Sequence, residues 1–409
     1  MKIQKLFYSL FFLALPEMLI SQNLLWAKKA NPTFNSINSV AFNASGTKVL
    51  SGTNCHPASI RMFDVSSSNL DWDYTVDTSY MCIMGIRFSN NNNYIASIEE
   101  FGNIFIFDNT GPSPIIKDTI NTGTSYGFSV TVSPDNVHVA VGCSNGKLKI
   151  YNIADGTLHK DINAHPSWVT SVSYAPNGQY IVSGGNDDKV KLWDTAGILL
   201  ATFNGHTQDI TQVKFSSTST ELISSSKDKS IRIWDISTGL LVRTLLGHSG
   251  FVNSFDISPD DTKIVSGSTD SLCKIWNYAT GDEIVTFGVK DSGSVNTVAW
   301  SPMGNKIATG NQLSDLMLWD VQSTLTAPSI TNTELELLVY PNPSIGIYNI
   351  SSKSKALIQN IQVYNFLGQL IIQQNLTNKI DLSHLQQGEY ILHCETMDQE
   401  VYKKILIKH

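Results

Sequence analysis

Residues 164–194 read AHPSWVTSVSYAPNGQYIVSGGNDDKVKLWD. This stretch holds three short runs rich in β-branched and aromatic residues: Val169–Tyr174, Tyr180–Ser183 and Val190–Trp193. Turn-forming residues separate the runs, so each is predicted to be a β-strand. A fourth run, Leu199–Phe203, follows after a short turn. The stretch therefore predicts a small antiparallel sheet of four strands.

The pattern recurs along most of the chain. Seven segments of the VKLWD type end 41 to 44 residues apart, at Asp64, Asp108, Asn152, Asp194, Asp235, Asn277 and Asp320. A strand-rich repeat of this length predicts an all-β propeller of seven four-stranded blades. Leu24–Lys29 is a strand-like run with no blade before it, whereas the last repeat, Val295–Val321, lacks a fourth strand. We therefore expect the first run to complete the last blade and close the ring.

The repeats resemble the WD-repeat family. Gly205-His206 and Gly247-His248 match its Gly-His pair, Ala164-His165 matches at the histidine, and SGGNDDKVKLWD, SSSKDKSIRIWD and SGSTDSLCKIWN match the end of its repeat. The resemblance implies a buried hydrogen-bonded network of His, Ser, Asp and Trp in three blades, with the choice of Ser within each cluster left open. By position the networks are His165, Ser183, Asp187, Trp193; His206, Ser224, Asp228, Trp234; and His248, Ser266, Asp270, Trp276. The other blades are expected to be held by packing, because Phe63, Phe107 and Tyr151 replace Trp and Leu313 replaces the turn Asp.

Both ends of the chain differ from the repeats. Residues 1–21 have a basic start and a short apolar run, which predicts a cleaved signal peptide, with an uncleaved anchor as the alternative. Residues 22–325 are assigned to the propeller, the Ser/Thr/Pro-rich residues 326–336 to a linker, and residues 337–409 to a small β-sandwich, expected to be immunoglobulin-like. The tail strands are expected at Ile347–Ile350, Ile361–Tyr364, Gln369–Gln373, Tyr390–His393 and Val401–Ile407.

The tail resembles the C-terminal sorting domain of type IX secretion cargo. The matching segments are VYPNP (Val339–Pro343), Gly346, VYNFLGQLI (Val363–Ile371), IDLSHLQQGEYIL (Ile380–Leu392) and KKILIKH (Lys403–His409). The resemblance implies handling by the type IX secretion machinery, removal of the tail, and a mature protein that is secreted or held on the outer cell surface. A structural sandwich or a carbohydrate-binding module is the alternative for this unit.

Composition and motifs exclude several classes of function. The net charge is −7, and residues 22–334 carry 20 basic and 28 acidic residues, which disfavours nucleic-acid binding. Apart from the first residues, no apolar run is long enough to span a membrane. No catalytic, cofactor-binding or metal-binding motif is present, and His56, His138 and His159 are interpreted as isolated turn or surface residues. We therefore expect no enzyme activity, cofactor or metal. A Cys55–Cys82 disulfide and a calcium site stay open.

One set of residues suggests a binding surface. The residue before the first strand of each blade is expected at one rim of the channel; these are Ser36, Cys82, Tyr126, Trp168, Asp209, Phe251 and Ser294. Exposed aromatic residues anchor peptides or stack on sugars. We hypothesise that Tyr126, Trp168 and Phe251 form a patch with Asp209 nearby, which binds a protein or peptide. A lectin-like glycan-binding propeller is the alternative, and an enzyme using rim carboxylates is a third reading without motif support.

Overall fold

The computed structural model describes residues 24–29, 36–54, 58–76, 82–123, 126–288, 293–321, 337–340, 347–352, 358–364, 370–375, 379–396 and 401–408. The chain forms two units, which divide between Thr324 and Leu325. All regular structure among the described residues is β-strand. The predicted signal peptide and the linker lie outside the described residues.

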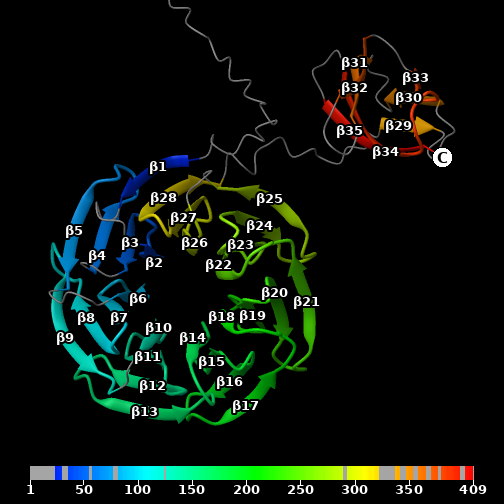
Figure 1. Cartoon of the computed structure of the whole chain (residues 1–409). Coiled ribbons are helices and arrows are strands. Elements are labelled where there is room, and N and C mark those ends of the chain that lie inside the picture. The colour runs from blue at the N-terminus through cyan, green and yellow to red at the C-terminus, as the bar shows by residue number, and fades with distance from the viewer. Residues whose placement is uncertain are drawn as a thin grey trace, which may run out of the picture. The chain divides into compact units, whose positions relative to one another are not determined.

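The first unit is a ring of seven four-stranded antiparallel sheets (Figure 1). From the channel outward, the first three blades are β2 (Ile37–Phe42), β3 (Lys48–Thr53), β4 (Ser59–Asp64), β5 (Leu70–Thr75); β6 (Ile83–Phe88), β7 (Tyr94–Glu99), β8 (Asn103–Asp108), β9 (Ile115–Asn121); and β10 (Gly127–Val132), β11 (His138–Cys143), β12 (Lys147–Asn152), β13 (Leu158–Asn163).

The next three blades are β14 (Val169–Tyr174), β15 (Tyr180–Gly185), β16 (Val190–Asp194), β17 (Leu199–Phe203); β18 (Ile210–Phe215), β19 (Glu221–Ser226), β20 (Ser230–Asp235), β21 (Leu241–Leu246); and β22 (Val252–Ile257), β23 (Lys263–Ser268), β24 (Cys273–Asn277), β25 (Glu283–Phe287). The seventh has β26 (Val295–Trp300), β27 (Lys306–Asn311), β28 (Asp315–Asp320) and, outermost, β1 (Leu24–Lys29).

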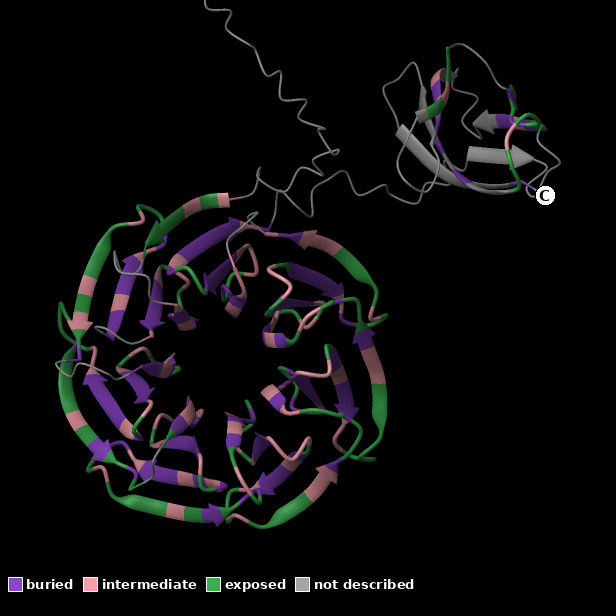
Figure 2. Cartoon of the chain, in the orientation of Figure 1, coloured by how far each residue is buried: buried purple, intermediate pink, exposed green. Residues whose placement is uncertain are grey.

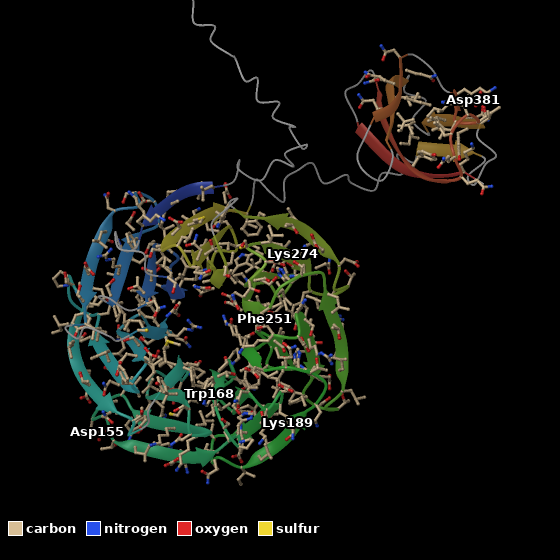
Figure 3. The ribbon with its side chains drawn as sticks, in the orientation of Figure 1. Asp155, Trp168, Lys189, Phe251, Lys274 and Asp381 are labelled. Carbon is tan, nitrogen blue, oxygen red and sulfur yellow. The ribbon has the colours of Figure 1, made fainter. Side chains whose placement is uncertain are left out.

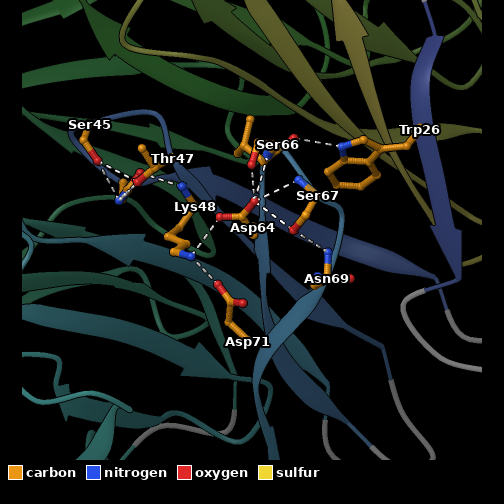
Figure 4. Close-up of polar contacts among 11 residues, drawn as sticks. Trp26, Ser45, Thr47, Lys48, Asp64, Ser66, Ser67, Asn69 and Asp71 are labelled. Carbon is orange, nitrogen blue, oxygen red and sulfur yellow. Dashed lines mark hydrogen bonds and ion pairs between the residues drawn. The ribbon is translucent and has the colours of Figure 1, made fainter.

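The ring closes as the sequence predicts. Strand β1 pairs antiparallel with β28, with Ala27 opposite Met317 and Lys29 opposite Asp315. The indole N–H of Trp26 also donates to the carbonyl oxygen of Val65 in blade 1, at 3.0 Å (Figure 4). One strand therefore joins the last blade to the first, and the prediction of a seven-bladed propeller closed by its N-terminal strand is confirmed.

The hydrophobic core lies between neighbouring blades. Figure 2 shows the inner strands mostly buried and the outer strands largely exposed. Each apolar cluster mixes two blades; for example, Leu148 and Ile150 of blade 3 pack with Val169 and Ile181 of blade 4. Because each blade buries its faces against two neighbours, the whole ring carries the stability that one isolated sheet would lack.

Polar side chains also join the innermost strands around the channel. The second residue of the first strand donates to a carbonyl oxygen of the next blade at five of the seven junctions: Asn38 to Ile83, Thr170 to Ile210, Thr211 to Val252, Asn253 to Val295 and Asn296 to Ile37. At the other two junctions the equivalent residues are Met84 and Phe128. Blades 2 and 3 thus bring apolar side chains to a channel that is otherwise polar.

The second unit consists of two sheets around one core. One sheet has the order β29 (Leu337–Tyr340), β30 (Ile347–Ser352), β33 (Lys379–Asp381), and the other β32 (Leu370–Asn375), β31 (Ile358–Tyr364), β34 (Gly388–Thr396), β35 (Val401–Lys408). Tyr348 and Ile380 of the first sheet pack with Ile361 and Leu392 of the second. The five expected strands are present, and β29 and β33 are additional. The immunoglobulin-like assignment stays a prediction.

Candidate functional site

The residues aligned at the rim occupy equivalent positions in all seven blades. In each blade the carbonyl oxygen of this residue accepts a hydrogen bond from the backbone N–H of the residue that follows the second strand. Asn186 donates to Trp168 at 3.1 Å, Thr269 to Phe251 at 2.9 Å and Ser144 to Tyr126 at 2.9 Å. This bond fixes the backbone of the rim, so a partner would meet side chains that are already positioned.

Tyr126 and Trp168 belong to an aromatic cluster on blades 2 to 4. The ring of Tyr126 stacks on Phe101 of blade 2, with centroids 6.2 Å apart, and Trp168 lies against Phe128 of blade 3 at 5.1 Å. Phe101, Tyr126 and Trp168 are each more than 40% exposed. We call these four residues the rim aromatics. Exposed aromatic rings gathered across three neighbouring blades form an apolar surface of the kind that binds partners.

The sequence analysis missed Phe101 and Phe128. Phe101 lies in the turn between β7 and β8, and Phe128 is the second residue of β10. The alignment compared only the position before the first strand, so neither residue was considered. A second signal was available, because Phe128 stands where five of the seven blades have an Asn or Thr that bonds to the next blade.

Phe251 lies away from the rim aromatics. It belongs to blade 6 and is 40% exposed, and Figure 3 shows it and Trp168 near the inner ends of their blades. Asp209 of blade 5 lies between these two blades in the ring order and pairs with Lys227, with the carboxylate oxygen 2.8 Å from Nζ. Tyr126 and Trp168 thus each contact one further aromatic ring, whereas Phe251 lies on a separate blade.

The turn that begins at Asn186, whose N–H donates to Trp168, carries the carboxylates of Asp187 and Asp188 beside Lys189. Asp188 lies in the turn between β15 and β16, with a backbone φ of 64°. Partial burial, and then the charges of Asp209, Asp187 and Asp228, raise the pKa of its carboxyl. Burial and the neighbouring carboxylates both disfavour the ionised form of Asp188, and a cationic group of a partner would favour it.

The structure links the implied network residues by hydrogen bonds. In blade 4, Nε2 of His165 lies 2.9 Å from Oγ of Ser183, Nδ1 lies 2.8 Å from Asp187, and Trp193 donates to Ser183 at 2.9 Å. The same contacts join His206, Ser224, Asp228 and Trp234 in blade 5, and His248, Ser266, Asp270 and Trp276 in blade 6. The three histidines are at most 7% exposed, so these groups build the blades and are not available to a partner.

Blades 1, 2 and 7 keep parts of this network. Ser51 and Ser97 stand at the position of Ser183, but their buried hydroxyls have no hydrogen-bond partner among the described residues. Their blades have Phe63 and Phe107 where a Trp would supply an N–H. In blade 7, Trp319 donates to Thr309 at 2.9 Å, and Phe287 packs edge-on against its ring.

The described residues show no group of three His, Cys, Asp or Glu side chains that could hold a metal ion. They also contain no helix long and apolar enough to cross a membrane. Cys82 is disulfide-bonded, and Cys55, the partner considered from the sequence, lies outside the described residues. Disulfides persist in oxidising compartments, which agrees with export.

Two families match the chain. The WD domain, G-beta repeat matches residues 156–194, 197–235, 239–277 and 281–320, and the secretion system C-terminal sorting domain matches residues 338–408. Each matched repeat begins with the outer strand of one blade and ends with the third strand of the next. The chain thus carries WD40 repeats in a seven-bladed propeller, followed by a sorting domain that indicates type IX export to the cell surface or the medium.

Curated relatives match parts of the chain. The chain is 30% identical over 96 residues to the nuclear distribution protein PAC1 of Candida tropicalis, which covers 22% of this chain and 20% of that protein. It is 24% identical over 135 residues to the groucho protein of Drosophila melanogaster (30% and 18%), and 39% identical over 61 residues to human WD repeat-containing protein 3 (15% and 6%). The chain spans a fifth or less of the length of these relatives.

Proposed function

We propose that this exported WD40 propeller is a non-catalytic binding protein that holds a protein or peptide partner at its rim. The observation that carries the proposal is the cluster of rim aromatics Phe101, Tyr126, Phe128 and Trp168, with its two ring–ring contacts and three exposed side chains. Large rings on a fixed backbone bury much apolar area while losing little conformational freedom.

The carboxyl group of Asp188 indicates which charge a partner at the rim would carry. The pKa of Asp188 is raised, chiefly by partial burial and then by neighbouring carboxylates, which favours a partner with a Lys or Arg side chain there. A peptide that combines apolar or planar anchors with one basic residue meets both features. A glycan would use the rings but gain less from the negative charge, so the protein or peptide is favoured.

Affinity capture from the native cell surface and medium tests the proposal. The bait is the mature chain, compared with a Phe101→Ala/Tyr126→Ala/Trp168→Ala variant. A matched control replaces three exposed aliphatic residues of the outer strands, Ile115, Leu158 and Leu199, with Ala. We expect one protein that binds the wild type and the control, and whose measured affinity falls at least tenfold for the rim variant.

Two results would overturn the proposal. One is a captured protein that binds the rim variant as tightly as the wild type, which would move the contact to another face. The other is capture that soluble polysaccharide abolishes and that leaves only glycan bound, which would establish the lectin-like alternative.

A further inference from the structure

The face of the ring opposite the rim carries a repeated contact between blades. There, the turn between the first two strands of every blade contains one residue with positive φ: Gly46, Asn92, Asn136, Gly178, Ser219, Asp261 and Gly304. Where this residue has a polar side chain, it accepts a backbone N–H from the turn of the preceding blade. The bonds run from Ala44 to Asn92, Asn91 to Asn136, Asn177 to Ser219 and Ser217 to Asp261. We call this contact the turn latch.

Glycine replaces the latch residue at three junctions, and one of these differs from the other two. A Cβ placed on Gly46 would contact Pro302 and Met303 of the preceding turn, and one on Gly304 would contact Pro259, both within 4 Å. A Cβ on Gly178 would have no neighbour within 4 Å. The turns of blades 3 and 4 are therefore neither latched nor packed at this point.

A cavity of about 530 Å³ lies at this junction. Blade 3 contributes Ser133, Pro134, Asp135, His138, Ile150 and His159, and blade 4 contributes Tyr174, Asn177, Gly178, Ile181 and Thr195. This volume is in the range of small-molecule sites. A groove of similar size at the junction of blades 4 and 5 has the Ser219 latch, and its lining includes Leu192 and Leu200 but no histidine.

Tyr174 is a polar residue in the lining of the cavity at blades 3 and 4. Tyr174 is only 9% exposed, yet its hydroxyl has no hydrogen-bond partner among the described residues. Burial, and then the charge of Asp135, raise the pKa of this phenol, so it stays a hydrogen-bond donor. A ligand in the cavity could therefore accept a hydrogen bond from this hydroxyl.

Two imidazole rings line the same cavity as this phenol. The rings of His138 and His159 are 4.5 Å apart, from strands β11 and β13 with β12 between them. Partial desolvation, and then His138, lower the pKa of His159, so this ring is neutral at pH 7 and offers one donor and one acceptor. The sequence analysis interpreted the two histidines as isolated; that interpretation was wrong, because residues 21 positions apart meet across the blade.

The chemistry of the lining excludes several ligands. No Lys or Arg lines the cavity and Asp135 is a carboxylate, so an anion would be repelled. The described residues contain no three-ligand group for a metal. A purely apolar molecule would desolvate the phenol and the imidazoles without offering them a partner. A neutral polyol fits, because each hydroxyl donates and accepts at once, while the apolar side chains of Pro134, Ile150 and Ile181 can contact a ring face.

We propose that the cavity between blades 3 and 4, lined by Asp135, His138, His159 and Tyr174, binds a neutral sugar unit. This site lies on the face opposite the rim aromatics, so it is independent of the proposed partner site. The chain would thus have one face for a protein and another for saccharide.

Titration of the mature chain with neutral sugars tests the proposal. The probes are the methyl glycosides of glucose, galactose, mannose and N-acetylglucosamine, with inorganic phosphate and zinc chloride alongside. Binding is followed by calorimetry and by saturation-transfer NMR. Tyr174→Phe removes only the hydroxyl and is expected to weaken binding about fivefold. Gly178→Asn adds a side chain to a residue of the cavity lining, where a Cβ would meet no neighbour within 4 Å, and should weaken binding at least tenfold by occupying that space.

Gly304→Asn is the matched control, because it makes the same change in a turn at another junction. We expect it to bind sugar as the wild type does, and all three variants to melt within a few degrees of the wild type. Sugar binding that survives Gly178→Asn would overturn the proposal by placing the site elsewhere. Failure of every sugar to bind, or binding of only phosphate or zinc, would overturn the assignment of a neutral saccharide.

Discussion

Trp234 donates its indole N–H to the hydroxyl of Ser224 at 2.9 Å, from the strand next to it in blade 5. The same hydroxyl lies 2.8 Å from Nε2 of His206, whose Nδ1 lies 2.8 Å from Asp228. Asp228 is a carboxylate that can only accept, so Nδ1 carries the proton and Ser224 donates to Nε2. Each polar group in this chain of bonds is therefore satisfied by its neighbours.

We expect Ser224→Ala to destabilise the propeller by about 2 kcal/mol, because it leaves a buried indole N–H and a buried imidazole nitrogen without partners. The measurement is the urea midpoint of unfolding, followed by tryptophan fluorescence. A loss below about 0.5 kcal/mol would mean that the network contributes little beyond its packing.

Ser51→Ala tests the same position in a blade without the network. The Ser51 hydroxyl is buried and has no partner among the described residues, and Phe63 stands where blade 5 has Trp234. Removing the hydroxyl should leave the free energy of unfolding, measured from the urea midpoint, unchanged or raise it by up to about 1 kcal/mol. A cost equal to that of Ser224→Ala would contradict the assignment of Ser51 as an orphaned member of the network.

The sequence predicted what depends on the repeat itself. The spacing of the VKLWD-type segments gave seven blades, and the missing fourth strand after Asp320 gave the closure by Leu24–Lys29, because both follow from counting strands within one period. The residues of the three complete networks could be assigned by position because each network lies within a single blade.

Contacts between neighbouring blades could not be predicted from the sequence. Phe101 meets Tyr126, and Phe128 meets Trp168, across junctions whose geometry depends on how two blades twist against each other. The opening at Gly178 could not be predicted either, since Gly46 and Gly304 occupy the same turn position and are covered by the preceding turn. The repeat period shows which residues occupy equivalent positions in the blades. It does not show at which of these positions the preceding turn packs against the residue.

Acid should weaken blade 6 through Asp270. Burial raises the pKa of this carboxyl, but the hydrogen bond and the charge of His248 outweigh it and lower the pKa to about 2. A pKa depressed by folding adds stability above the unfolded value of about 3.9, and this contribution is lost as pH falls from about 4 to 2. Asp270→Asn should therefore lower the free energy of unfolding by about 1–2 kcal/mol at pH 7, and this difference from wild type should shrink toward pH 2. Urea midpoints between pH 7 and 2.5 measure this; a constant difference would show that the carboxylate charge is not involved.

Trp26 tests whether the N-terminal strand holds the ring closed. Its indole donates to Val65 at 3.0 Å and its ring lies 6.4 Å from that of Phe63, while the backbone of β1 pairs with β28 of blade 7. Nearby, Lys48 forms ion pairs with both Asp64 and Asp71, which hold together the part of blade 1 that Trp26 contacts (Figure 4). We expect Trp26→Ala to lower the free energy of unfolding by about 2 kcal/mol and to weaken the pairing of β1 with β28, so that the edge of β28 becomes exposed. Hydrogen exchange measured by mass spectrometry should rise in residues 315–320 and stay unchanged in residues 180–185 of blade 4.

Lys29→Ala is the control, because its pair with Asp315 joins an exposed side chain at 2.8 Å and such pairs contribute about 0–1 kcal/mol. Equal exchange in the two variants would show that pairing alone, without the indole, closes the ring.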